Sequence, residues 1–272
     1  MKIGIVSLGL IGGSLFKCLA RTNNEIYAVT TNKETFEKAK KYSPFVSTEL
    51  TILKDCEIVF VASPINKTLE MLDALENVVD KNCIVLDCAS VKEFVMKKER
   101  PYKFIGSHPM AGTQFSGFDA AFKELFEGAK WVLTPLNADE DDIKTVEKVI
   151  KSTGAEIIIT NAKEHDYAVA LISHMPLLIS QSLFNAVKDN KLALKLASSG
   201  FRDMTRLATS NLEMAQDMRN YNDKNIAKAL DMLASSINEL KNTKVLEVFA
   251  DIKNKSCGIE YLEDVNNLTY QM

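Results

Sequence analysis

The chain lacks the features that would suit a nucleic acid or a membrane. Its 272 residues carry a net charge of −3 and show no basic stripe, so no nucleic acid partner is expected. No apolar run approaches the ~20 residues that span a bilayer, so no membrane partner is expected. The chain passes from Met1 straight into an apolar segment without the features of a signal peptide, which predicts a cytoplasmic protein.

Cysteine is also scarce, and its spacing matches no metal site. The five cysteines lie in segments that read as strands or helices, so we interpret them as reduced, small apolar residues and expect no metal. They are Cys18, Cys56, Cys83, Cys88 and Cys257. Apolar residues make up 46% and charged residues 25% of the chain, which is ordinary for a globular protein with a large core. The length favours two domains.

The first stretch, KIGIVSLGLIGGSLF, predicts a strand, a glycine turn and a helix. Ile3 to Val6 form a short apolar run that is typical of a buried parallel strand. Gly9 would let the backbone approach a pyrophosphate, and Gly12 would let the helix pack closely on the strand. Ser7 replaces the first glycine of the usual dinucleotide-binding fingerprint. A tight turn that binds no ligand is the alternative interpretation.

Strands and helices alternate over the first 160 residues. We expect further strands at 25–30, 57–62, 83–87, 104–107, 131–134 and 156–160, with helices at 34–41, 66–79 and 139–152. This alternation predicts a Rossmann-type, doubly wound α/β sheet that is mostly parallel. Ligands of such sheets lie beyond the carboxyl ends of the strands. Ser7, Gly9, Ser63–Pro64, Ser90 and His108 follow predicted strands, so we expect them to share one crevice.

The pattern becomes helical after Asn161. Asn161 and Glu164 resemble a capping box, and a long helix is expected from Lys163 to about Lys188, kinked at Pro176. We therefore divide the chain into a dinucleotide-binding domain, 1–161, and an all-helical domain, 162–272. The apolar surface of the helices predicts a homodimer through the second domain.

The three histidines have open interpretations at the level of the residues alone. His108, at the end of a strand and before a proline, could take a proton from a substrate hydroxyl, or could simply bond to the backbone. His165 lies in the first turn of a helix and is better explained as part of the helix start than as a catalytic group. His174 lies beside the expected kink, where it could line a cleft or satisfy freed backbone groups.

Two arginines are candidates for binding a carboxylate. Arg202 and Arg206 are four residues apart and would share a helix face. An arginine turned into a cleft can hold a carboxylate by two parallel hydrogen bonds. The alternative is a surface pair with Asp203 or Glu213, which contributes little to stability.

Taken together, five stretches resemble the prephenate/arogenate dehydrogenase family of tyrosine biosynthesis. They are LGLIGGSL at the start, ASVK at 89–92, GSHPMAGT at 106–113, EHDYAVALISHMP at 164–176 and FRDMTRLATSN at 201–211. The resemblance implies a Rossmann domain joined to a helical dimerisation domain. It implies that His108 accepts the hydrogen of the ring hydroxyl with Ser90 nearby, and that Arg206 binds a substrate carboxylate. We also assign His174 and Thr113 to the substrate site.

The resemblance implies oxidative decarboxylation of prephenate to 4-hydroxyphenylpyruvate with hydride transfer to NAD(P)+. Arogenate, which would give tyrosine directly, is the alternative cyclohexadienyl substrate. Leu177, Gln114 and Ala215 depart from residues common in the family, which leaves the choice of substrate open. A β-hydroxyacid dehydrogenase, for which Lys163 would be a poorly placed catalytic lysine, and a non-enzymatic NAD(P)-sensing protein are less favoured.

The segment after the second predicted strand bears on the choice between NAD and NADP. NAD-specific sites place an acidic residue at the end of this strand, whereas here Thr30, Thr31, Asn32 and Lys33 follow it. Hydroxyl, amide and ammonium groups can donate hydrogen bonds to a 2′-phosphate, so NADP is slightly favoured over NAD. The residues expected to bind the cofactor are Ser7, Gly9, Leu10, Ile11, Gly12, Thr30, Thr31, Asn32, Lys33, Ser63 and Pro64.

Overall fold

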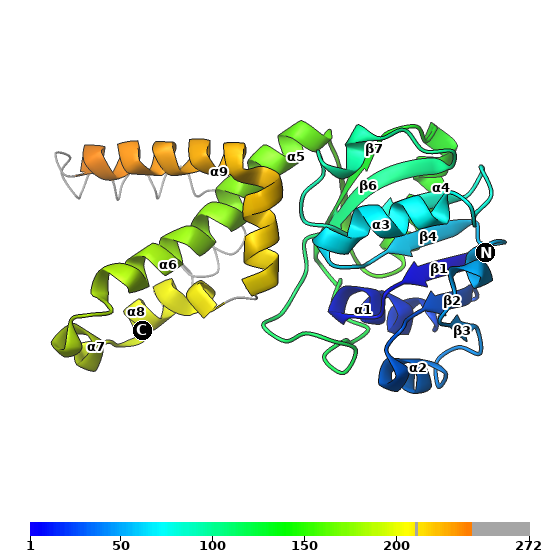
Figure 1. The fold of residues 1–272 in the computed structure, drawn as a ribbon, viewed down its shortest axis with the longest axis horizontal. Helices are drawn as coiled ribbons and strands as arrows, with labels where there is room; N and C mark the ends of the chain where they lie inside the picture. Colours follow the sequence, from blue (N-terminus) through cyan, green and yellow to red (C-terminus); the bar gives the residue numbers. More distant parts are fainter. Residues whose placement is uncertain (210–211, 241–272) are drawn as a thin grey trace, which may run out of the picture. The chain divides into compact units, whose positions relative to one another are not determined.

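The structure is a computed structural model that describes residues 1–209 and 212–240 (Figure 1). The described residues form an eight-stranded sheet with the order β3-β2-β1-β4-β5-β6-β7-β8. Its strands are β1 Lys2–Val6, β2 Glu25–Val29, β3 Val46–Ser47, β4 Ile58–Val61, β5 Ile84–Asp87, β6 Lys103–Pro109, β7 Lys130–Pro135 and β8 Glu156–Ile159. All neighbours are parallel except β6 and β7. The predicted doubly wound, mostly parallel sheet is confirmed.

Two of the helices that connect the strands begin with a side-chain cap. The connecting helices are α1 Leu10–Leu19, α2 Lys33–Ala39, α3 Ile65–Leu75 and α4 Glu140–Lys151, with the 3₁₀ turns η1 Leu50–Leu53 and η2 Val95–Lys97. Asn32 caps α2 by accepting a hydrogen bond from the backbone of Thr35. Asp139 and Asp142 form a reciprocal capping box at the start of α4. These local bonds satisfy N–H groups that have no partner inside the helix.

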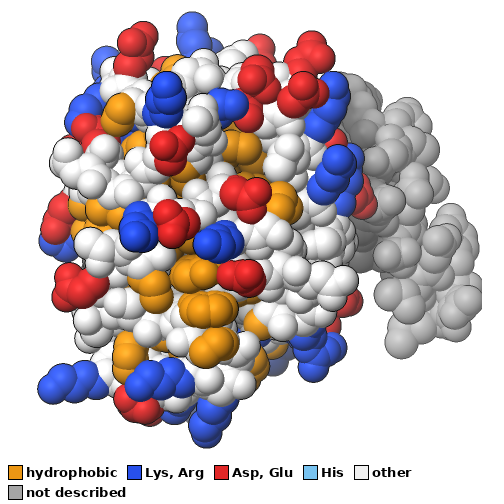
Figure 2. Space-filling model, turned by 90° about the vertical axis from the view of Figure 1, so that its right-hand side faces the viewer, with side chains coloured by type: hydrophobic (Ala, Val, Ile, Leu, Met, Phe, Trp, Pro, Cys, Tyr) orange, Lys and Arg blue, Asp and Glu red, His pale blue; other side chains and the backbone are white. Residues whose placement is uncertain are grey.

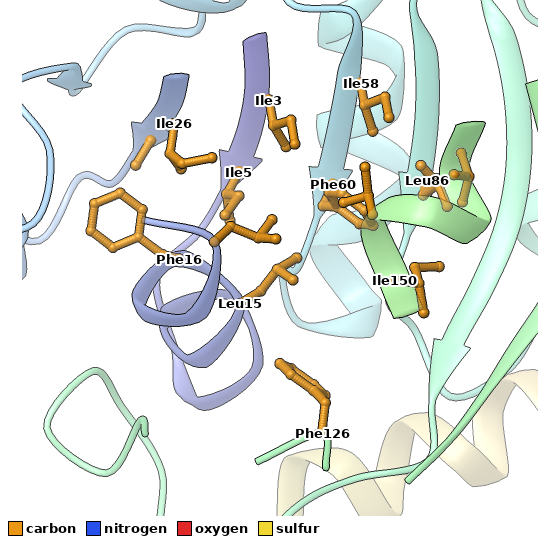
Figure 3. Packing of buried hydrophobic residues seen from close by; sticks show 14 of the residues in the cluster. Ile3, Ile5, Leu15, Phe16, Ile26, Ile58, Phe60, Leu86, Phe126 and Ile150 are labelled. Carbon is orange, nitrogen blue, oxygen red and sulfur yellow. The ribbon is translucent and has the colours of Figure 1, made fainter. Parts of the chain in front are cut away.

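The core consists of two layers, one on each face of the sheet. Ile3 and Ile5 of β1 point to one face, where they belong to one apolar cluster with Leu15 and Phe16 of α1 and Ile150 of α4 (Figure 3). The next strand residues point to the other face and pack against α3 and η2. This alternation follows from the two-residue repeat of a strand. Because both faces are covered, the central strands are apolar on both sides.

Among the described residues, β3 is the one strand that the sequence did not predict. It has only two residues, Val46 and Ser47, which pair with Ala28 and Val29 of β2. Two residues are too few to show an alternating or continuous apolar pattern. The strand matters for the site because it carries the segment 48–51 to the carboxyl end of the sheet.

Positive and negative side chains are mixed on the face shown in Figure 2. There, Lys and Arg side chains lie among Asp and Glu side chains. Such mixing gives no extended basic surface to a polyanion on this face.

The described residues after 160 are helical, as predicted. The elements are α5 Ala162–Val169, the π-helical turn η3 Ala170–His174, α6 Met175–Val187, α7 Lys191–Leu196, α8 Ser199–Thr205, the 3₁₀ turn η4 Arg206–Thr209 and α9 Leu212–Leu240. The long helix is interrupted next to Pro176, where the N–H of Met175 bonds to the carbonyl of Ala170 in a wider turn. This turn explains the kink, because proline offers no N–H to continue the regular ladder.

By its contacts the chain forms two compact units, the first ending at Ile226 and the second beginning at Ala227. The predicted domain boundary at 161/162 lies inside the first unit and stays a prediction. Cys257 lies outside the described residues.

The helical run 162–187 is more apolar than the sequence inspection suggested. It contains an 18-residue window with a mean hydropathy of 1.4, which by length and composition could cross a membrane. Only 28% of that window is buried. Core and interface helices of proteins that cross no membrane meet the same criterion. The run also carries the buried polar side chains of His165, Asp166 and His174.

Candidate active site

The glycine turn between β1 and α1 has the geometry that a pyrophosphate needs. Ser7 adopts a positive φ of 70°, a conformation that glycine adopts more readily. A Cβ on Gly12 would lie 2.0 Å from the carbonyl oxygen of Ser7, so only glycine lets α1 approach the strand this closely. Gly9 precedes α1 and has nothing within 4 Å of the position of a Cβ. The first N–H groups of α1 receive no side-chain cap there, so they can bind an anion.

A cavity of about 690 Å³ lies beside this turn, at the carboxyl ends of β1, β2 and β4. Seven of the predicted cofactor residues line it: Ser7, Gly9, Thr30, Thr31, Asn32, Ser63 and Pro64. Leu10, Gly12 and Lys33 do not line it. Gly12 acts through helix packing, and Lys33 is an exposed residue at the start of α2. Because Asn32 uses its side-chain oxygen to cap α2, its amide nitrogen is the group left to donate.

Two carboxylates in this cavity were missed from the sequence. Glu49 reaches it from the segment after β3, and Glu70 reaches it from α3. Glu70 pairs with Lys67, whose Nζ lies 3.0 Å from Oε2 of Glu70. Glu49 is exposed and precedes η1. The prediction of the cofactor rested only on the segment after β2, so it did not weigh these two carboxylates.

A second cavity, of about 280 Å³, adjoins the first and shares Ser63 and Pro64 with it. Ile11, Ser90 and His108 line it, as does Asp217 of α9. The predicted crevice is thus present as two joined cavities. The Oγ of Ser90 is buried and has no hydrogen-bond partner within the part of the chain that the structure describes. An unpaired buried hydroxyl beside a cavity is suited to bond a ligand.

His108 stands at the end of β6 and is held from behind by a second histidine. Its Nδ1 lies 2.9 Å from Nε2 of His165, and Nδ1 of His165 lies 2.7 Å from Oδ1 of Asp166. The carboxylate of Asp166 also accepts hydrogen bonds from the backbone N–H groups of Lys92 and Glu93. His165 is 3% exposed and Asp166 is 0% exposed. The sequence pattern indicated a role for His165 in the helix start and did not predict this contact.

The surroundings keep two histidines neutral. Burial holds the pKa of His108 well below its usual value, and the nearby His165, Lys92 and His174 lower it further. Burial also lowers the pKa of His174 to about 4. A neutral imidazole at His108 can accept a hydrogen bond, which an imidazolium cannot do.

A buried ion pair supports the ends of β5 and β6. The ammonium of Lys92 contacts the carboxylate of Asp87, and both side chains are fully buried. Lys92 also donates to the carbonyl of Ser107, 2.6 Å away, next to His108. Asp87 accepts from the backbone N–H groups of Ala89 and Ser107. The pair therefore fixes both the segment of Ser90 and the strand end of His108. No local sequence pattern links Asp87 and Lys92.

The predicted substrate residues are not gathered in these cavities within one chain. Arg206 is exposed at the start of η4, and Thr113 is exposed in a loop where it bonds to the backbone of Phe115. Neither lines the two cavities. His174 is buried, its Nδ1 lies 3.2 Å from Nδ2 of Asn222, and its Nε2 has no partner among the described residues.

Comparison with known proteins accounts for nearly the whole chain. Residues 18–159 match the family model of the prephenate dehydrogenase nucleotide-binding domain. Residues 161–248 match the model of the prephenate dehydrogenase dimerization domain. A prephenate dehydrogenase of Lactococcus lactis is 30% identical over 91% of this chain and 74% of its own length.

Solved structures agree with these matches. Synechocystis arogenate dehydrogenase superposes with a TM-score of 0.80 and 32% identity over 100% of this chain and 99% of its own. Prephenate dehydrogenase from Aquifex aeolicus, in complex with hydroxyphenyl propionate and NAD+, superposes with a TM-score of 0.80 and 28% identity, covering 100% of this chain and 98% of its own.

Proposed function

Because the chain belongs to the prephenate dehydrogenase family, we propose that it oxidises and decarboxylates prephenate to 4-hydroxyphenylpyruvate, with hydride transfer to NAD(P)+. The observation that carries the proposal is the pair of joined cavities. One is built around the glycine turn of a dinucleotide site, and the other presents Ser90 and His108 beside it. A substrate ring in the small cavity would therefore lie next to the nicotinamide end of a cofactor in the large one.

The residues of the large cavity fit a dinucleotide. The uncapped start of α1 and the open space at Gly9 suit the pyrophosphate, and the segment Thr30–Asn32 suits the adenosine end. The cofactor supplies hydride acceptance when it is bound. The chain itself orients the substrate ring and controls the hydroxyl proton.

We assign the base role to His108, with Ser90 as its neighbour at the substrate hydroxyl. As hydride leaves C4 of the ring, the hydroxyl hydrogen bonds to the neutral imidazole of His108, which favours build-up of carbonyl character at C4. Loss of carbon dioxide from C1 then makes the ring aromatic. The balanced reaction releases no net proton, so any proton that His108 takes up returns to the phenol oxygen.

For Arg206 we propose a contact with a substrate carboxylate, and for His174 and Thr113 a place in the substrate site. The proposal rests on their positions in the family motifs, since none of the three lines the cavities of the single chain. Replacing Arg206 with alanine should raise the KM for the cyclohexadienyl substrate and leave the affinity for the cofactor unchanged. Loss of a charge-assisted contact costs roughly 1.5–3 kcal/mol. An unchanged KM would remove Arg206 from the site.

For the cofactor, we propose that NADP is used at least as well as NAD. Support comes from the hydroxyl and amide groups after β2. The test is kcat/KM for both cofactors in the wild type and in Glu49→Gln. A preference for NAD above ~100-fold, about 2.7 kcal/mol, would overturn the proposal. If Glu49→Gln then lost that preference, the ribose would be bound by Glu49.

We further propose a cytoplasmic homodimer that pairs through the helices after 160. Large apolar side chains are exposed there, including Ile172 at 67% and Leu196 at 72%. A second copy would cover such a surface. The four described cysteines, Cys18, Cys56, Cys83 and Cys88, are free, which suits a reducing compartment.

The experiment that tests the function compares prephenate and arogenate with purified protein and either cofactor. We expect 4-hydroxyphenylpyruvate from prephenate as the main product. Faster turnover of arogenate, with tyrosine as product, would favour the alternative substrate. The 3-hydroxyisobutyrate dehydrogenase of Mycobacterium tuberculosis shares the fold, with a TM-score of 0.54 at 12% identity, and that likeness extends to the fold alone.

A further inference from the structure

We propose that His165 and Asp166 fix the tautomer of His108, so that Nε2 of His108 keeps the lone pair that accepts the hydroxyl hydrogen of the substrate. In this role they are positioning residues that act through His108. The inference rests on the proposed function, because it concerns the base of that reaction. The tautomer itself can nevertheless be measured in the protein without any substrate.

The hydrogen-bond chain can be assigned from its buried end. Oδ1 of Asp166 accepts from the backbone N–H of Lys92 at 2.7 Å, and Oδ2 accepts from that of Glu93 at 2.8 Å. A carboxylate that takes two backbone donors acts as an acceptor toward its third neighbour. Nδ1 of His165, 2.7 Å from Oδ1, must therefore carry a hydrogen.

The assignment then passes from His165 to His108. We place a single hydrogen on the ring of His165, at Nδ1, so that its Nε2 is bare and can only accept. Nδ1 of His108 lies 2.9 Å from that nitrogen, so Nδ1 of His108 must donate. The free lone pair of His108 is left on Nε2. One ring nitrogen is thus set by the bond that the other makes.

The surroundings of His108 agree with a neutral ring. Burial holds its pKa well below the usual value, and the positive charge of Lys92 lowers it further. The ammonium of Lys92 is itself bound to Asp87 and to the carbonyl of Ser107. The ability of a neutral imidazole to accept a hydrogen bond at Nε2 depends on its tautomer, because only the form with its hydrogen on Nδ1 has a lone pair at Nε2.

The alternative role for His165, in starting α5, is already performed by other residues. The side chain of Asn161 accepts from the backbone of Glu164, and Glu164 accepts from the hydroxyl of Thr160. Neither bond involves the ring of His165. Burying an imidazole that serves no other purpose would cost free energy.

Histidine NMR tests the tautomer directly, because the chain has only three histidines. Protein labelled with ¹⁵N-histidine gives three ring spectra, which single substitutions assign. We expect His108 to carry its hydrogen on Nδ1 in the wild type. In His165→Gln the amide oxygen lies near the former Nε2 and can still accept, so the tautomer should persist. In His165→Asn the shorter side chain cannot reach, and His108 should populate the form with a hydrogen on Nε2.

Steady-state kinetics on the same variants give the second readout. His165→Asn should lower kcat by roughly 10²-fold or more, with little change in the KM for the substrate or for the cofactor. A general base, and the tautomer that lets it act, each raise the rate of catalysis by at least about this factor. His165→Gln should stay within about 10-fold of the wild type, because it keeps the acceptor. Glu164→Gln, an exposed neighbour in the same helical turn, should match the wild type and serves as the control.

Three results would overturn the inference. They are a wild-type His108 with its hydrogen on Nε2, an unchanged tautomer in His165→Asn, and an equal loss of kcat in the asparagine and glutamine variants. If His165→Asn does not fold, the wild-type and His165→Gln spectra still decide the tautomer. A wild type that turns over no cyclohexadienyl substrate would refute the proposed function, while the spectra would test the tautomer separately.

Discussion

Removing the ammonium of Lys92 should destabilise the protein more than removing any ammonium from its surface. Lys92→Met keeps a side chain of similar length but leaves the carboxylate of Asp87 buried without its cation. The backbone N–H groups of Ala89 and Ser107 would still donate to Asp87, and they would offset only part of the loss. Breaking one side of a buried ion pair costs about 3–5 kcal/mol. That is a large share of the ~5–15 kcal/mol that holds a typical domain folded.

The assay is urea unfolding followed by circular dichroism, with Lys98→Met as the matched control. Lys98 pairs with Asp73 on the surface, where both side chains are 51% exposed, so its loss should cost ~1 kcal/mol or less. Combining Lys92→Met with Asp87→Leu should recover part of the stability, because the unpaired charge is then gone. If Lys92→Met and Lys98→Met lowered the free energy of unfolding equally, the buried pair would not be holding the ends of β5 and β6.

Three further predictions concern the base, the glycine turn and the assembly. Activity should fall at low pH as His108 becomes protonated, and because its pKa is lowered, the acid limb of the kcat profile should lie below pH ~6.5; a limb near neutrality would contradict this. Gly12→Ala should abolish cofactor binding in a fluorescence titration, since its Cβ would meet the carbonyl of Ser7 at 2.0 Å, whereas Gly9→Ala should leave the fold intact because the space there is open. Light scattering should give about twice the chain mass of 30.3 kDa, and a monomer at micromolar concentration would count against the dimer.

The parts of the fold that the sequence predicted are those with a local pattern. The apolar run Ile3–Val6, the glycine turn and the helical spacing of Leu15, Phe16 and Leu19 lie within one stretch of chain, and the structure has them as β1 and α1. Residues that follow the strands could be predicted to lie close together, because parallel strands end at the same edge of the sheet. Ser63 and His108, which come from the ends of different strands, line the same cavity for this reason.

The contacts that were missed join residues far apart in the chain. His108 and His165 are separated by 57 positions, and no local pattern links them. The sequence did contain one signal of this contact. His165 and Asp166 are adjacent on a helix that Asn161 already caps, so the pair is not needed for the helix start. Glu49 was not predicted to lie near the cofactor, because β3 is too short to show a strand pattern. Without β3, the segment after it could not be assigned to the carboxyl end of the sheet. For Arg206 the family motif implies a contact with a substrate carboxylate, whereas in the single chain its side chain does not line either cavity.

The most direct test of the account measures carbon dioxide and NAD(P)H together after prephenate is added to the purified protein. We expect equal amounts of both from the wild type. We also expect a rate that falls by roughly 10²–10⁴-fold in His108→Asn while the affinity for the cofactor is kept. Reduced cofactor without carbon dioxide, or an asparagine variant that turns over at nearly the normal rate, would contradict it.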